Sequence, residues 1–184
     1  GQSAGTAIAD VLFGDYNPAG RLPVTFYKSD NDLVDFNDYS MENRTYRYFK
    51  SDPLYGFGYG LSYTSFFYDQ VKIPTVSPAG KKITISARVT NKGKKDGEEV
   101  VQLYITNENK SIKAPLKALK GFKRIFLKAG ESRIVQFTLT PQDLSVADEN
   151  GTYKSLKGKL GISIGGGQPD EKRQTTSNVV KKTI

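Results

Sequence analysis

Cysteine and histidine are both absent from the 184 residues of this sequence. Without cysteine there is no thiol nucleophile, disulfide or thiolate metal site. Without histidine the chain lacks the commonest metal ligand and the side chain that most readily transfers protons near neutral pH. A Ser-His-Asp or Cys-His catalytic apparatus therefore cannot be built from this chain alone, and any chemistry here would have to use carboxylates, tyrosines or lysines.

Tryptophan is absent as well, and no run of about 18 apolar residues occurs, so the sequence predicts no membrane span. Apolar residues make up 37% and charged residues 25% of the chain, a composition that allows a folded core. The sequence begins "GQSAGTAIAD" rather than with methionine. We expect a fragment or processed chain, whose missing targeting signal is uninformative about the parent protein.

The net charge of +8 is unevenly distributed. Residues 1–66 hold five Lys or Arg and eight Asp or Glu, a net −3, whereas residues 67–184 hold 22 and 11, a net +11. The change falls in "PLYGFGYGLSYTSFFYD", where Gly56, Gly58 and Gly60 alternate with aromatic residues. Because glycine disfavours both helix and strand, this stretch predicts a boundary between two parts of the chain. The alternative is an ordinary aromatic-rich loop inside one core.

The first residues predict a short amphipathic helix. Apolar side chains recur at helical spacing on one face, at Ala4, Ala7, Ile8, Val11 and Leu12. Ser3 is the expected N-cap, and Gly14 can end the helix in the left-handed conformation. So short a helix is not stable alone in water, and residues 13–66 hardly supply a partner for its apolar face. Residues 1–66 are therefore predicted to end an α/β domain whose sheet lies upstream, with a short edge strand at 22–26.

Beyond residue 66 the pattern becomes that of β-strands. Apolar and polar residues alternate at 83–89, 101–105, 135–139 and 160–164, with turn-rich connectors between them. Further strands are expected at 67–73, 119–127 and 152–156. Seven short strands in about 100 residues predict an immunoglobulin-like or fibronectin type III-like β-sandwich over residues 67–168. Residues 169–184 are predicted to be a loose polar tail, with a short edge strand near 179–180 as the alternative.

Five stretches together resemble the C-terminal portion of glycoside hydrolase family 3, which includes β-glucosidases and β-xylosidases. They are "GQSAGTAIADVLFGDYNPAGRLPVTF", "NRTYRYF", "PLYGFGYGLSYTSF", "VTNKGKKDGEEVVQLYI" and "LKGFKRIFLKAGESRIVQFTLTPQDLS". The resemblance implies a TIM-like barrel, then an α/β sandwich domain, then a fibronectin type III-like domain. On that layout residues 1–66 end the α/β sandwich domain, which matches the boundary drawn from charge and periodicity. The layout also implies that Gly56–Gly60 form a linker that folds back over the α/β domain, with its aromatic residues packed between domains.

The resemblance also implies a retaining β-glycosidase acting on β-glucosyl or β-xylosyl residues, secreted or periplasmic. Such enzymes use two carboxylates, a nucleophile and a general acid/base. In the family both lie upstream of the motifs present here, so no residue of this chain is assigned as catalytic, and the chain alone is expected to be inactive. The implied partners are the upstream barrel and α/β domain, in the same or a separate chain, and an oligosaccharide substrate. No cofactor and no metal are expected.

One acidic stretch, "SDNDLVDFNDYSMEN", holds several carboxylates close together in the sequence. Its spacing does not fit a calcium-binding loop, which needs a Gly at the sixth position and a Glu at the twelfth. A solvated acidic loop is the predicted structure. Long loops on a rigid scaffold often carry binding residues. We therefore hypothesise that Asp38, Tyr39 and Arg44 line the rim of the parent enzyme's sugar pocket.

Two other function classes remain open from the sequence: an autonomous carbohydrate-binding module and a cell-surface adhesion domain. A sugar-binding sandwich would be expected to show a row of exposed Trp or Tyr, whereas the tyrosines here gather at 39–68. The lysine excess suggests nucleic-acid binding as a further alternative. However, the basic residues are dispersed, with Glu98, Glu99 and Glu131 among them, so a solvated surface is predicted, without a nucleic-acid or membrane partner.

Overall fold

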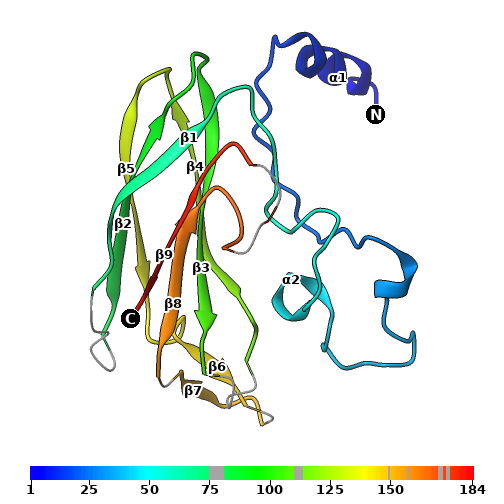
Figure 1. Ribbon diagram of the computed structural model, residues 1–184, viewed down its shortest axis with the longest axis vertical. Coiled ribbons are helices and arrows are strands. Elements are labelled where there is room, and N and C mark those ends of the chain that lie inside the picture. The colour runs from blue at the N-terminus through cyan, green and yellow to red at the C-terminus, as the bar shows by residue number, and fades with distance from the viewer. Residues whose placement is uncertain (75–80, 110–113, 149, 157, 170–171, 173–174) are drawn as a thin grey trace.

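The computed structural model describes residues 1–184 except 75–80, 110–113, 149, 157, 170–171 and 173–174. A β-sandwich is preceded by a long segment that runs beside it and carries short helices (Figure 1). These are α1 (Ala4–Phe13), the 3-10 helix η1 (Asp30–Asp32) and α2 (Thr45–Tyr48). The predicted fold class, mainly β with a fibronectin-like sandwich, is confirmed.

The sandwich consists of two antiparallel sheets. The first has the strand order β1-β2-β5, with β1 at Phe66–Lys72, β2 at Ile83–Asn91 and β5 at Ser132–Leu139. The second has the order β4-β3-β8-β9, with β4 at Ala118–Leu127, β3 at Gly97–Asn107, β8 at Leu160–Gly165 and β9 at Val179–Thr183. A separate pair joins β6 (Ser145–Ala147) to β7 (Tyr153–Ser155). Each of the seven predicted strands corresponds to one of these elements.

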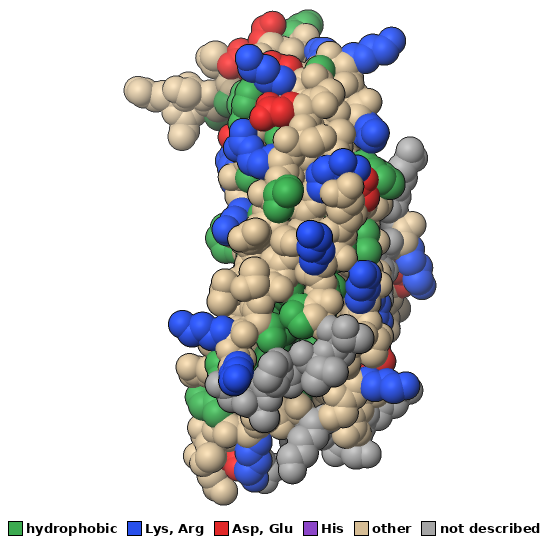
Figure 2. All heavy atoms as spheres, turned by 90° about the vertical axis from the view of Figure 1, so that its left-hand side faces the viewer, with side chains coloured by type: hydrophobic (Ala, Val, Ile, Leu, Met, Phe, Trp, Pro, Cys, Tyr) green, Lys and Arg blue, Asp and Glu red, His purple; other side chains and the backbone are tan. Residues whose placement is uncertain are grey.

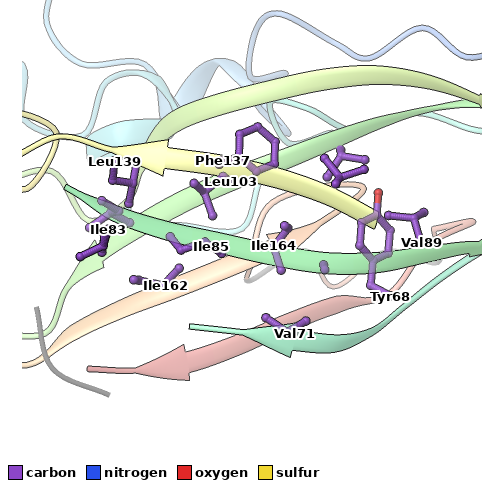
Figure 3. Close-up of a cluster of buried hydrophobic side chains, with 14 of the residues drawn as sticks. Tyr68, Val71, Ile83, Ile85, Val89, Leu103, Phe137, Leu139, Ile162 and Ile164 are labelled. Atoms are coloured by element: carbon purple, nitrogen blue, oxygen red, sulfur yellow. The ribbon is translucent and has the colours of Figure 1, made fainter. Parts of the chain in front are cut away.

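The core lies between the two sheets and is built from the alternating apolar residues. Ile83, Ile85 and Val89 of β2 are at most 2% exposed, and they lie among side chains of the opposite sheet such as Leu103 and Ile164 (Figure 3). Burying one side chain of this size stabilises the fold by about 1.5–3 kcal/mol. Burial on one face fixes the strand register, because a slip of one residue would turn the apolar set outward.

The C-terminal end is not loose from residue 175 onward. β9 pairs antiparallel with β8, and Val180 packs against the core. The Asn178 side chain bonds both the backbone N–H and the carbonyl of Tyr68, at 2.7 and 3.0 Å, and so joins β1 of the other sheet to this segment. The expected loose tail is therefore wrong for these residues, whereas the edge strand at 179–180 is confirmed. The apolar side chain of Val180 and the amide of Asn178 stabilise the docking of this segment on the sandwich, as a purely polar tail could not.

The N-terminal segment agrees with the sequence analysis in part. Helix α1 forms as predicted, and Gly14 ends it with φ +84°. Ser3 occupies the N-cap position, but its side chain makes no capping hydrogen bond, so that expectation is wrong. The strand expected at 22–26 is reduced to a single bridge between Phe26 and Tyr55, since Pro23 has no N–H to donate to a ladder.

Helix α1 keeps its apolar face in solvent. None of its residues is buried, and Ile8 and Leu12 are 60% and 72% exposed. Tyr63 ties the helix to the sandwich side through its hydroxyl, which donates to the carbonyl of Val11 at 2.6 Å. Within the described ranges, no helix is long and apolar enough to cross a membrane.

Charged residues of the sandwich mostly lie at its surface. On the face presented in Figure 2, Lys and Arg side chains are scattered singly rather than gathered into one patch. Several have acidic partners, as in the Arg88–Asp69 pair between β2 and β1. Glu99 is the exception to the expected solvated surface, because its side chain is 0% exposed. Glu99 is instead a buried ion, and its partner comes from the N-terminal segment.

Candidate functional site

The three residues hypothesised to bind sugar lie together in the loop between η1 and α2. Arg44 holds this loop by donating hydrogen bonds to backbone carbonyls. Its Nη2 donates to Asp35 at 3.2 Å and also to Asp38, and its Nε donates to Ser40 at 3.1 Å. Arg44 therefore acts first as a brace that fixes the shape of its own loop.

Asp38 and Tyr39 present polar groups at the surface of this loop. The Asp38 carboxylate accepts the backbone N–H of Ser40 at 2.8 Å, and hydrogen bonding from Ser40 lowers the pKa of Asp38 below its ordinary value of 3.8. Asp38 is thus an ionised acceptor at neutral pH. The Tyr39 side chain is 90% exposed and free to stack against a ligand. Their role in sugar binding stays a prediction.

The neighbouring carboxylates serve the turns of the same loop. Asp32 accepts the backbone N–H groups of Lys28 and Ser29 at 3.0 and 3.2 Å, and Asp35 accepts that of Asn37 at 2.7 Å. Over the described part of the chain, no group of three or more His, Cys, Asp or Glu residues could hold a metal ion.

A pocket of about 390 Å³ opens beside this loop. Its lining residues are Pro23, Val24, Thr25, Tyr27, Met41, Thr45, Tyr46, Arg47 and Phe57. Tyr46 and Phe57 stack with ring centroids 4.2 Å apart and planes 14° apart, and Met41 belongs to the same loop as Asp38. Sequence reasoning missed this pocket. The sequence signal for it is the high density of aromatic residues in "RTYRYF" and "GFGYG". The sequence does not show that these two stretches meet, because their contact depends on the fold.

The pocket combines apolar walls with a few polar groups. Arg47 adds a cation, and the Thr25 hydroxyl has no hydrogen-bond partner among the described residues. Thr45 has φ +52°, a strained conformation for a β-branched residue. Aromatic walls with a small number of polar groups are typical of ligand sites. The lining residues that the structure describes include no carboxylate.

The aromatic wall is fixed to the sandwich by a buried polar platform on β3. The Tyr104 ring meets Tyr46 edge-on at 6.2 Å, and its hydroxyl donates to Gln102 at 2.6 Å. The Gln102 amide donates to the carbonyls of Gly58 and Gly166, both at 3.0 Å. Burial raises the pKa of Tyr104, so its hydroxyl remains a donor. The glycine-aromatic stretch thus packs closely on the sandwich.

Comparison with known proteins assigns both halves of the chain. Residues 1–63 match the family model described as glycosyl hydrolase family 3 C-terminal domain, and residues 99–168 match the fibronectin type III-like domain. The chain is 48% identical over 166 residues to a xylan 1,4-beta-xylosidase of Xylanibacter ruminicola, covering 90% of this chain and 19% of that protein. It is 40% identical over 179 residues to a periplasmic beta-glucosidase of Salmonella typhimurium, covering 90% and 23%.

Solved structures give the same assignment. The beta-D-glucoside glucohydrolase of Trichoderma reesei superposes with a TM-score of 0.81 and 30% identity, covering 100% of this chain and 29% of that one. The chain spans about a fifth to a quarter of the length of the curated relatives it matches, between 19% and 26%.

Proposed function

The chain belongs to glycoside hydrolase family 3, and from that premise we propose that it forms the C-terminal part of a retaining β-glycosidase. This enzyme would hydrolyse non-reducing terminal β-glucosyl or β-xylosyl residues of oligosaccharides. The observation that carries the proposal is the match of the chain along nine-tenths of its length to a β-xylosidase and to a β-glucosidase.

The two parts of the chain have different roles in this proposal. Residues 1–66 complete the α/β domain, and the sandwich is a structural module that holds them in place. The catalytic carboxylates come from the upstream barrel and α/β domain, and the exposed apolar face of α1 supports such a partner. A secreted or periplasmic location is supported by the periplasmic β-glucosidase among the relatives.

Asp38, Tyr39 and Arg44 are proposed to contribute to the rim of the substrate site in the complete enzyme. In support, their loop also supplies Met41 to the aromatic pocket, which offers rings for stacking on a pyranose. The exposed ring of Tyr39 and the ionised carboxylate of Asp38 are suited to contacts with sugar hydroxyls.

A chimera tests the proposal. The matching part of the Xylanibacter ruminicola β-xylosidase is replaced by this chain, and hydrolysis of nitrophenyl β-xyloside and β-glucoside is measured. We expect turnover by the chimera and none by the same enzyme truncated before the matching segment. A chimera that is folded and monodisperse but inactive on both substrates would contradict the proposal. Tyr39→Ala in the active chimera should raise KM, whereas the exposed sandwich control Tyr153→Ala should not.

A further inference from the structure

A buried carboxylate lies where the sandwich meets the N-terminal segment. Glu99 of β3 accepts hydrogen bonds on both oxygens: Oε1 from the hydroxyls of Tyr68 at 2.8 Å and Ser177 at 2.6 Å, and Oε2 from Arg21. Burial, together with the Glu99 charge, raises the pKa of Tyr68 well above its ordinary value of 10.0, so Tyr68 remains a donor. The sandwich itself provides only two neutral donors to Glu99, the hydroxyls of Tyr68 and Ser177. The positive charge that pairs with Glu99 comes from Arg21 of the N-terminal segment.

Arg21 reaches this position with two guanidinium nitrogens, Nη2 and Nε, while Nη1 bonds the preceding residue of its own segment. Nη2 lies 2.5 Å from Glu99 Oε2, Nη1 donates to the carbonyl of Gly20 at 3.0 Å, and Nε donates to the carbonyl of Gly166 at 3.4 Å. The Arg21 side chain is 7% exposed. An ammonium group is a single point donor on a flexible stem and cannot reproduce this planar arrangement.

Two glycines form the walls around the pair. A Cβ on Gly166 would lie 2.2 Å from Glu99 Oε1 and 2.5 Å from Ser177 Oγ. A Cβ on Gly60 would lie 2.2 Å from the carbonyl oxygen of Gly20 and 2.8 Å from Arg21 Nη1. Because real Cβ atoms do not approach this closely, both positions require glycine for the guanidinium and carboxylate to meet.

We propose that Glu99, Tyr68, Ser177 and the carbonyl of Gly166 form a socket on the sandwich that is specific for a guanidinium group. Arg21 fills this socket and so fixes the N-terminal segment, with the aromatic pocket it carries, on the four-stranded sheet. Four parts of the sandwich contribute to the socket: β1 through Tyr68, β3 through Glu99, the residue after β8 through the Gly166 carbonyl, and the stretch before β9 through Ser177. Arg21 is thus a positioning residue for the whole segment, independent of the substrate on which the enzyme acts.

Hydrogen exchange in the full chain tests the socket. The amides of Leu22 and Gly58 report on the segment, because they bond to the carbonyls of Tyr59 at 2.9 Å and Leu22 at 2.7 Å. We expect Arg21→Lys and Arg21→Ala to accelerate their exchange roughly 100-fold or more, with much smaller changes in β2. The control Arg88→Lys alters an ion pair that is 39% and 30% exposed, and should leave Leu22 and Gly58 unaffected.

Chemical rescue identifies the ligand class. Guanidinium chloride, at concentrations far below those that unfold the chain, should restore protection of Leu22 and Gly58 in Arg21→Ala. Methylammonium chloride at equal ionic strength should not, and neither salt should act on Arg21→Ala combined with Glu99→Gln. Three results would each overturn the proposal: lysine replacing Arg21 without loss of protection, equal rescue by methylammonium, or acceleration in β2 as large as in the segment.

Discussion

Gly58 is the position where the close packing of the linker on the sandwich can be measured most directly. Its φ is +79°, and a Cβ there would lie 2.2 Å from Gln102 Oε1 and 2.9 Å from the Tyr104 hydroxyl. Gly58→Ala therefore introduces two separate problems: a left-handed backbone for an alanine, and displacement of the Gln102 amide from its buried hydrogen bonds. Gly130 has almost the same φ, +78°, with nothing within 4 Å of the added Cβ, and so isolates the first problem.

The two substitutions should differ by the contribution of the polar platform. Left-handed backbone costs an alanine about 1–2 kcal/mol, which is the whole effect expected for Gly130→Ala. Moving Gln102 leaves buried polar groups without partners, at about 1–3 kcal/mol for each group. We expect Gly58→Ala to lower the free energy of unfolding by about 3–5 kcal/mol in total. For a chain of this size that corresponds to a fall in Tm of roughly 10 °C.

Urea and thermal unfolding followed by circular dichroism measure both variants against the unsubstituted chain. Gln102→Leu alone and combined with Gly58→Ala completes a double-mutant cycle. Gly58→Ala should lower the free energy of unfolding less in the Gln102→Leu background, because the amide that it displaces is no longer present. Equal destabilisation by Gly58→Ala and Gly130→Ala would refute the reasoning. It would mean that the linker can move away from β3 without lowering the free energy of unfolding.

Other expectations concern activity, the exposed helix and pH. The chain alone should not turn over nitrophenyl β-glucoside or β-xyloside, and activity that survives repurification would disprove this. Ile8→Ser with Leu12→Ser should leave the Tm of the isolated chain within about 2 °C, because both side chains are already exposed, but should lower the Tm of the chimeric enzyme; an unchanged Tm of the chimera would exclude α1 as a contact. The Arg88 hydrogen bond lowers the pKa of Asp69 below 3.8, so its stabilisation is present above that pH and lost as pH falls further. Asp69→Asn should accordingly lower the Tm at neutral pH but not near about pH 2, and an equal loss at both pH values would contradict this linkage.

The sandwich was predictable from the sequence because its strands have one face in the core. At β2 the alternation is strict, and the residues expected inside, Ile83, Ile85, Ala87 and Val89, are at most 2% exposed. Separate family models match residues 1–63 and residues 99–168. The alternation of apolar and polar residues predicts burial correctly at β2 because one face of the strand lies in the core, whereas the opposite face stays at least partly exposed from Thr84 to Arg88.

Strand β3 shows where that reasoning stops. Gln102 and Tyr104 occupy outward positions, yet they are 2% and 0% exposed because the N-terminal segment covers this face. Glu99 occupies an inward position, where a charge is unfavourable unless it is paired. Its partner Arg21 is 78 residues away in the sequence. No local pattern connects two such residues, so the sequence predicts a solvated Glu99 and gives no sign of its buried ion pair with Arg21.

The candidate site divides in the same way. Asp38, Tyr39 and Arg44 could be proposed from a polar loop alone, and they do lie together because Arg44 bonds the carbonyls of its own loop. The adjoining pocket required convergence of residues 23–27, 41–47 and 57, which only the packing of the linker produces.

The N-terminal segment is thereby split into two parts with different partners. The Arg21 side chain and the Gly58 carbonyl find partners on the sandwich, through the Glu99 ion pair and the Gln102 amide. The apolar face of α1 finds none there, although a ten-residue helix needs such contacts to be stable in water. The contacts on the sandwich therefore account for the position of the segment but not for the apolar character of the α1 face, on which Ile8 and Leu12 are 60% and 72% exposed. Any contact that buries the Ile8 and Leu12 side chains would therefore stabilise α1, because isolated helices of this length are marginal in water.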